Sequence, residues 1–149
     1  MILPDFKDFP RTGRIIGIDW GARRTGVAVA SENREFVFVR EPIVVARGGD
    51  LVGAVADLVC AEQVVGIVIG LPLRMDGSES ETTKQVREFA TALAERVNLP
   101  ICFIDETLSS SSAQESMGCV RVRDIKEKLD SESARVILEN AIAIINRIK

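Results

Sequence analysis

The sequence predicts a single α/β domain built on a mixed five-stranded sheet that is flanked by helices. Three observations predict it. A chain of 149 residues, 46% of them apolar, fits one domain and can bury one core. Two apolar strands joined by a glycine-bounded turn are expected at 14–20 and 25–30. The second half then alternates apolar strands with segments of helical periodicity, which makes those strands parallel.

The antiparallel part of the sheet comes first. Residues 1–13 carry two prolines and no periodicity, so we expect a tail on the surface, with the domain formed by 14–149. A third antiparallel strand is expected at 35–40, after the polar turn at 31–34. A first helix follows, and Asp50 stands where its N-cap is expected.

The parallel part supplies two strands and two long helices. Residues 64–69 are apolar throughout, which suits a strand buried on both faces, and a last strand is expected at 101–104. Beyond it we expect a short helix at 109–117, a basic loop at 118–129 and a last helix that opens at Asp130. The helix between the two strands has an apolar stripe that consists of Val86, Phe89, Ala90, Leu93 and Val97. The last helix has one that consists of Ala134, Ile137, Ala141, Ile144 and Ile148.

Three antiparallel strands followed by helix, strand, helix, strand and helices form the ribonuclease H-like order. Functional sites in such sheets lie at the carboxyl ends of the parallel strands. The opening of the chain taken alone would also fit an ATPase of the actin or Hsp70 type. That alternative is disfavoured, because a two-domain ATPase would not fit into this length.

The composition narrows the chemistry. The chain has no histidine, so carboxylates are the natural metal ligands, and they favour Mg²⁺ or Mn²⁺ over Zn²⁺. The net charge of −3 gives no global positive field, so nucleic acid would have to bind through a local patch. Cys60, Cys102 and Cys119 are widely spaced, which indicates reduced thiols in a cytoplasmic protein. No signal peptide or membrane span is recognisable, so we expect a soluble protein with no membrane partner.

Acidic residues stand at the ends of three predicted elements. Asp19 ends the first strand, Asp105 and Glu106 follow the last strand, and Asp130 opens the last helix. Asp130 precedes Ala134 by four residues, which places it on the helix face that packs on the sheet. Clustered carboxylates repel one another unless cations lie between them, and two hard cations can activate water and stabilise the leaving oxygen of a phosphodiester. The pattern predicts a metal-dependent nuclease.

These acidic residues also have structural interpretations. Asp130 could be a helix N-cap, and Asp105 with Glu106 could be a solvated strand end. Asp19 is harder to explain in this way, because Asn or Ser would serve a turn equally well.

Basic residues accompany the acidic ones. Arg23 and Arg24 stand in the turn after Asp19, where a phosphate would arrive. The dense positive segment before Asp130 could supply further phosphate contacts, although it could also be an ordinary exposed loop. Its basic residues are Arg121, Arg123, Lys126 and Lys128.

Four motifs, at 17–29, 69–77, 105–110 and 130–134, resemble in order and spacing those of the YqgF/RuvX family. These bacterial ribonuclease H-like proteins are described as Holliday junction resolvases and as pre-16S rRNA processing nucleases. The resemblance implies catalytic carboxylates, which are Asp19, the pair Asp105 and Glu106, and Asp130. This chain departs from the family pattern at Thr107, where the family usually has an arginine, and at Ser133, where it usually has an alanine.

We therefore predict a phosphodiester hydrolase that acts on structured nucleic acid, with Asp19, Glu106 and Asp130 holding Mg²⁺ or Mn²⁺. Processing of the 5′ end of pre-16S rRNA in ribosome biogenesis is the first choice of function. Holliday junction resolution in DNA recombination and repair is an alternative, and Thr107 leaves open a catalytically weak nucleic-acid-binding adaptor. The expected partner is an rRNA precursor or branched DNA. Two symmetric cuts in a junction require a dimer, so we expect a monomer or a weak homodimer.

Overall fold

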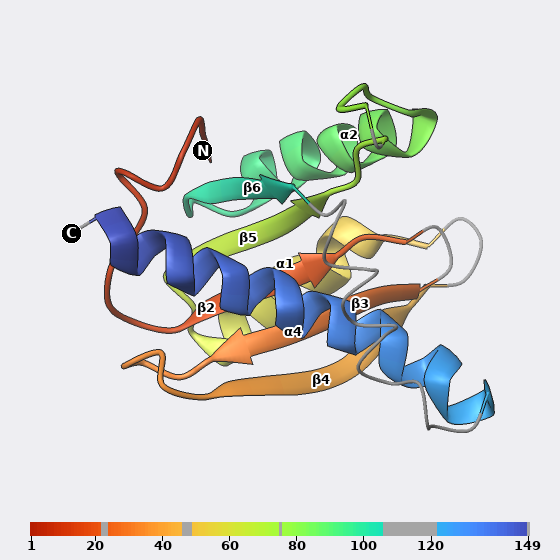
Figure 1. The fold of residues 1–149 in the computed structure, drawn as a ribbon, viewed down its shortest axis with the longest axis horizontal. Helices are drawn as coiled ribbons and strands as arrows, with labels where there is room; N and C mark the ends of the chain where they lie inside the picture. Colours follow the sequence, from red (N-terminus) through yellow and green to blue (C-terminus); the bar gives the residue numbers. More distant parts are fainter. Residues whose placement is uncertain (22–23, 46–48, 75, 106–121, 149) are drawn as a thin grey trace.

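A mixed sheet of six strands forms the centre of the protein (Figure 1). The computed structural model describes residues 1–21, 24–45, 49–74, 76–105 and 122–148. The strands are β1 (Ile2–Leu3), β2 (Ile15–Asp19), β3 (Arg24–Ala30), β4 (Val37–Val44), β5 (Gly66–Leu71) and β6 (Ile101–Asp105). Their order across the sheet is β1-β6-β5-β2-β3-β4. The pairs β2–β3 and β3–β4 are antiparallel, and β2–β5, β5–β6 and β1–β6 are parallel. The predicted α/β class with mixed strand directions is confirmed, with six strands instead of five.

Helices cover both faces of this sheet (Figure 1). Helices α1 (Leu51–Glu62) and α2 (Glu81–Arg96) pack on one face, and α4 (Val122–Ile148) crosses the other. Asp50 is the N-cap of α1, as predicted, and its carboxylate accepts the Gly53 N–H at 2.9 Å. The predicted stripe of α2 is buried from Val86 to Leu93. Alternate residues of each inner strand therefore belong to two separate cores.

The N-terminal segment is part of the structure, and the predicted surface tail was wrong. Ile2 pairs with Ile101, so β1 adds a parallel strand beside β6. Phe6 and Phe9 are buried in the core on the α4 side, and their rings meet edge to face at 5.4 Å. One helix leaves part of that face uncovered, and two aromatic side chains fill it. A segment of this kind needs neither helical nor strand periodicity, so the sequence pattern did not reveal it.

The last helix also differs from the prediction, because it begins by Val122. Asp130 therefore lies inside α4 and is not its N-cap. Residues 122–131 contain no Gly or Pro, and opposite charges such as Asp124 and Lys128 stand four residues apart, which favours a helix. The predicted basic loop is thus helical where it is described, and its basic residues there are Arg123, Lys126 and Lys128. Arg121 and the short helix expected at 109–117 lie outside the described residues.

Candidate active site

Asp19 ends β2 on the side of the sheet that α4 covers. Ile15 belongs to the core beneath α4, and a Cβ atom at Gly17 would lie 2.9 Å from the Cβ of Leu138 in α4. Side chains of a strand alternate between faces, so Asp19 points to the same side as positions 15 and 17. Asp19 is half-buried. Its carboxylate therefore stands at the carboxyl end of β2, beside the long helix.

The positions on both sides of Asp19 are glycines. Gly26 of β3 is its antiparallel partner, and the parallel register of Ile18 with Ile69 continues to Gly70 of β5. Neither neighbouring strand therefore carries a side chain next to this carboxylate.

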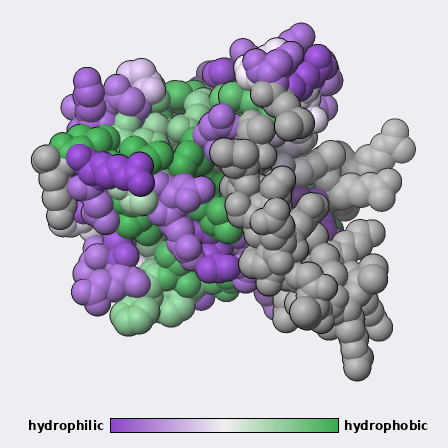
Figure 2. All heavy atoms as spheres, in the orientation of Figure 1, coloured by the Kyte–Doolittle hydropathy of each residue, from purple (hydrophilic) through white to green (hydrophobic). Residues whose placement is uncertain are grey.

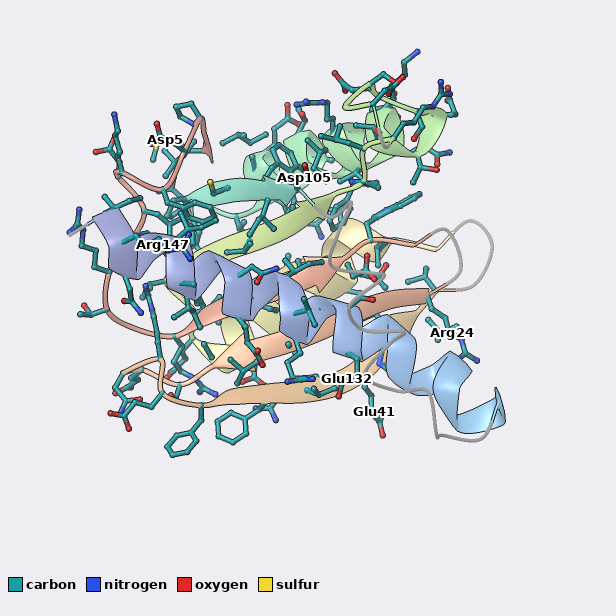
Figure 3. The ribbon with its side chains drawn as sticks, viewed as in Figure 1. Asp5, Arg24, Glu41, Asp105, Glu132 and Arg147 are labelled. Atoms are coloured by element: carbon teal, nitrogen blue, oxygen red, sulfur yellow. The ribbon has the colours of Figure 1, made fainter. Side chains whose placement is uncertain are left out.

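A tight turn joins Asp19 to the next strand. A Cβ atom at Gly21 would lie 2.1 Å from the carbonyl oxygen of Arg24, so only glycine fits there. The hydroxyl of Thr25 lies 3.4 Å from both the N–H and the carbonyl oxygen of Gly21 and closes the turn. Arg24 begins β3, and alternation from Gly26 puts it on the α4 side with Asp19. Figure 3 shows Arg24 beside the N-terminal half of α4. Arg23 lies outside the described residues.

Asp105 lies on the opposite side of the sheet from Asp19. Its register partner in β5 is Leu71, which belongs to the core under α1 and α2. Phe103 shares that side, and the guanidinium of Arg87 in α2 lies 5.6 Å from the centre of its ring. Asp105 is exposed at the tip of β6 (Figure 3). The structure does not bring Asp105 and Asp19 onto one face, and Glu106 lies outside the described residues.

The backbone of α4 brings Asp130 level with Asp19. The helix runs antiparallel to β2 (Figure 1), and the carbonyl oxygen of Ala134 would lie 3.0 Å from a Cβ atom at Gly17. The four helical residues from Ala134 back to Asp130 cover about 6.0 Å. Two strand residues from Gly17 on to Asp19 cover about 6.6 Å in the same direction. The side chain of Asp130 lies outside the described part of the chain.

The described side chains do not by themselves form a metal site. Among them, no three histidine, cysteine, aspartate or glutamate residues are grouped in a way that could hold an ion. The predicted ligand set lies only partly among the described side chains, since it needs Glu106 and Asp130 in addition to Asp19. The donor chemistry fits a hard cation, because all three are carboxylates and the chain lacks histidine.

The loop after β5 is a compact hairpin. Leu73 and Glu79 form an isolated antiparallel bridge, and the Arg74 N–H donates to the Ser78 carbonyl at 2.9 Å. The hydroxyl and N–H of Ser78 both donate to Asp76, at 2.6 and 2.9 Å, and these bonds lower the pKa of that carboxyl. The side chain of Thr83 in α2 donates to the Pro72 carbonyl and anchors the loop. The residues of this motif thus serve the shape of the loop.

Two features near Asp19 were not singled out from the sequence. Gly17 allows α4 to approach β2, and Gly26 and Gly70 put no side chain beside Asp19. The sequence signal for this arrangement was a glycine in each of the three neighbouring strands, β2, β3 and β5, next to the position of Asp19. Trp20 is partly buried against the α1 and α2 core. Within the described residues, none of the helices is both long and apolar enough to span a bilayer.

The strand order and the placement of Asp19 define a ribonuclease H-like nuclease fold. The same fold occurs in "T. thermophilus RuvC in complex with Holliday junction substrate", with a TM-score of 0.58, 11% identity, and coverage of 90% of this chain and 96% of that chain. It also occurs in the fowlpox virus Holliday junction resolvase, with a TM-score of 0.55, 7% identity, and coverage of 87% and 98%.

The chain belongs to the RuvX family, whose model, described as "RuvX: Holliday junction resolvase", matches residues 13–143. A relative from Maridesulfovibrio salexigens is 37% identical over 132 residues, covering 87% of this chain and 98% of its own length. One from Sphingopyxis alaskensis is 37% identical over 147 residues, covering 97% and 96%. Both carry the name "Putative pre-16S rRNA nuclease". The protein is therefore a nuclease, a phosphodiester hydrolase.

Proposed function

We propose that the protein is a Mg²⁺- or Mn²⁺-dependent cytoplasmic nuclease that trims the 5′ end of pre-16S rRNA. The observation that carries the proposal is the close approach of α4 to β2 at Gly17. Two residues further along β2, Asp19 is level with the backbone of Asp130 in α4. The names of the relatives support the RNA substrate. The glycines on both sides of Asp19, which put no side chain next to its carboxylate, support a bound cation.

Three carboxylates would hold the metal in this proposal. They are Asp19, Glu106 and Asp130. Asp105 is turned toward α2, which leaves its neighbour Glu106 as the third ligand. The bound ions would activate a water molecule and stabilise the leaving oxygen of the phosphodiester.

Basic residues would hold the substrate strand on the α4 side. Arg24 stands on that side at the start of β3, within reach of a phosphate near Asp19. Arg123 and Lys126 precede Asp130 by seven and four residues, so helical spacing puts their positions on the same stripe of α4. The remaining basic positions of the proposal are Arg23, Arg121 and Lys128.

Cleavage assays with two substrates test this function. Purified protein would be incubated with labelled pre-16S rRNA and with a four-way DNA junction, in Mn²⁺, in Mg²⁺ or in chelator. We expect metal-dependent cleavage of the RNA at its 5′ side. Cleavage that persists in chelator, or an uncut RNA under every metal, would overturn the proposal.

The effect of the metal ion on the melting temperature tests metal binding independently of cleavage. An ion that binds only the folded protein raises the melting temperature by mass action. Mn²⁺ should therefore raise the melting temperature of the wild type and raise that of Asp19→Asn less. Equal shifts in the two proteins would show that Asp19 does not hold the ion.

Junction resolution is the second candidate, favoured by the description of the family model. It requires two coordinated cuts and hence two copies of the chain. Paired symmetric cuts in the junction, with the RNA left intact, would support it over RNA processing.

A further inference from the structure

One segment gathers most of the exposed large apolar side chains of the described residues. Phe36, Phe38, Val39 and Val44 are 61%, 45%, 41% and 67% exposed, and all lie in β4 or next to it. The other two such residues, Met1 and Ile2, belong to the N-terminus and β1. Figure 2 shows apolar side chains along the lower rim of the molecule, where β4 runs in Figure 1. Phe38 lies on the α1 side of the sheet and Val39 on the α4 side, so exposed apolar side chains flank the edge of β4 on both faces. An exposed apolar edge of this kind is a candidate interaction site.

Strand β4 is also an edge of the sheet. It has eight residues and pairs with β3 on one side, and no further described strand follows it in the sheet order. Natural proteins protect such edges with lysine, proline or very short strands. The opposite edge is protected, because β1 has two residues. In β4 the protecting features, which are the charged Arg40 and Glu41 and then Pro42, lie in the second half of the strand, so the backbone and side chains of 36–39 remain available for pairing.

The charges around this surface argue against nucleic acid as its occupant. Arg40 lies 5.8 Å from the centre of the Phe38 ring, and its guanidinium also forms a salt bridge with Glu62 of α1 at 3.2 Å. Glu35 and Glu41 stand on either side of the aromatic pair in the sequence. The cation beside the Phe38 ring is thus already neutralised, and a phosphate would gain little from it. A partner with apolar side chains along an unpaired strand edge fits better, and a second copy of β4 offers both.

We propose that β4 forms the interface of a homodimer, pairing antiparallel with β4 of a second copy across a two-fold axis at Phe38. An axis perpendicular to the sheet keeps each side chain on its own face only if residues of the same parity lie opposite one another. The register centred on Phe38 sets this ring against the partner subunit's Phe38 and Val37 against the partner subunit's Val39. It sets Phe36 against the partner subunit's Arg40 and ends there, because the next pair would bring Glu35 opposite a second glutamate, and Pro42 beyond it has no N–H to donate.

This dimer leaves the candidate active site open. Phe38 pairs with Val29, which pairs with Ile16, three residues before Asp19. The contact is therefore at the edge of the sheet, level with the amino end of β2 and away from its carboxyl end. The pairing is isologous, so it closes at two copies and does not extend into a fibre.

Sedimentation equilibrium over a wide range of protein concentration tests the interface. We expect the wild type to dimerise reversibly. Phe38→Lys would place two like charges opposite one another, so its dissociation constant should rise at least tenfold. Val44→Lys is the matched control, because Val44 is the more exposed residue of the same strand but lies beyond Pro42. It should dimerise like the wild type, and circular dichroism would check that both variants fold.

Disulfide trapping tests the register. In a Cys60→Ser background, Phe38→Cys should form an intermolecular disulfide on oxidation, since opposite residues of antiparallel strands have Cα atoms about 4.5 to 5.5 Å apart. Val44→Cys should not. A wild type that stays monomeric at all concentrations would overturn the proposal, as would equal weakening by both lysine variants. Monomers whose RNA binding falls in Phe36→Ala and Phe38→Ala would assign the surface to nucleic acid instead.

Discussion

Two amphipathic helices, α1 and α2, cover one face of the sheet, whereas the other is shared by a single long helix, α4, and the N-terminal segment. Asp105 lies on the first face, at the exposed end of β6. On the second face Asp19, Gly17 and α4 come together. Acidic residues at the carboxyl ends of two strands of one sheet, β2 and β6, are therefore not equivalent. The position of each carboxylate along its strand decides on which face of the sheet it lies, and Asp19 lies on the face where the backbone of α4 brings Asp130 level with it.

The largest effect is expected at the two acidic strand ends. Asp19→Asn removes a charge without changing shape, so it should abolish cleavage and leave the melting temperature near that of the wild type. Residues that only support metal ligands typically contribute about 10- to 100-fold, so a direct ligand should exceed that range. Asp105→Asn should lower kcat/KM by less than about tenfold, because Asp105 faces α2. Equal losses in both variants would show that the two faces share one site.

The next effect concerns how the α4 face is covered. Phe9→Ala should destabilise the protein by about 3 to 5 kcal/mol, the usual cost of removing a buried aromatic ring. Phe89→Ala, in α2 on the opposite face, should cost a similar amount. Urea unfolding measures both. A cost below about 0.5 kcal/mol for Phe9→Ala would return residues 1–13 to a surface role.

These two predictions mark the limit of what the sequence could show. Periodic elements were predicted, since strand alternation and the α2 stripe follow directly from burial. The N-terminal segment was not, because Phe6 and Phe9 fill a gap that exists only after the sheet and α4 have assembled. The separation of Asp105 from Asp19 depends on the register Leu71–Asp105, which a single sequence does not contain. The sequence prediction began the last helix at Asp130, because an aspartate is a common N-cap, whereas α4 begins by Val122.

A smaller effect is expected where α4 meets β2. Gly17→Ala would bring a Cβ atom to 2.9 Å from Leu138 and 3.0 Å from the Ala134 carbonyl, so the helix must shift. Overpacking of this kind costs about 1 to 3 kcal/mol. Cleavage by the folded variant should also fall, because Asp130 moves with the helix.

Gly66→Ala is the control for that prediction. Its Cβ atom would lie 2.6 Å from the Phe9 ring, away from α4. It should lower stability without lowering the activity of the folded protein. Full activity in Gly17→Ala would show that cleavage does not depend on the position of α4 against β2.

A weaker effect is expected for substrate binding. Every basic side chain that neutralises a phosphate of a single strand adds about 0.7 to the slope of log K against log salt. Alanine at both Arg123 and Lys126 should therefore reduce that slope for single-stranded RNA by about 1.4. Alanine at Arg87 and Arg96, both in α2 on the other face, should leave the slope unchanged. Binding titrations at several salt concentrations measure the slope. A smaller slope for the α2 variant alone would show that the RNA binds on the α2 face and not on the α4 face.

The smallest effect is a difference in thiol reactivity between Cys102, which is buried, and Cys60, which is exposed. Cys102 is buried in β6 beneath the α4 side core, and Leu3 of β1 is its register partner. Burial, followed by the negative charge of Asp5, raises the pKa of its thiol to about 11. The native protein therefore holds this proton more tightly than the unfolded chain, whose thiol has a pKa of about 8.5. The resulting stabilisation is complete below that value and is lost as the pH rises toward 11.

Alkylation at pH 8, followed by peptide mass spectrometry, should label Cys60 and leave Cys102 unmodified. Only the thiolate reacts, so labelling of Cys102 should increase about tenfold with each pH unit up to its pKa. Denatured protein, in which both peptides should be labelled, is the control. Phe9→Ala should raise the rate for Cys102 but not for Cys60, because the N-terminal segment shares the core that buries Cys102. If native Cys102 reacts as fast as Cys60, the segment does not seal that face, and the two faces differ less than their packing implies.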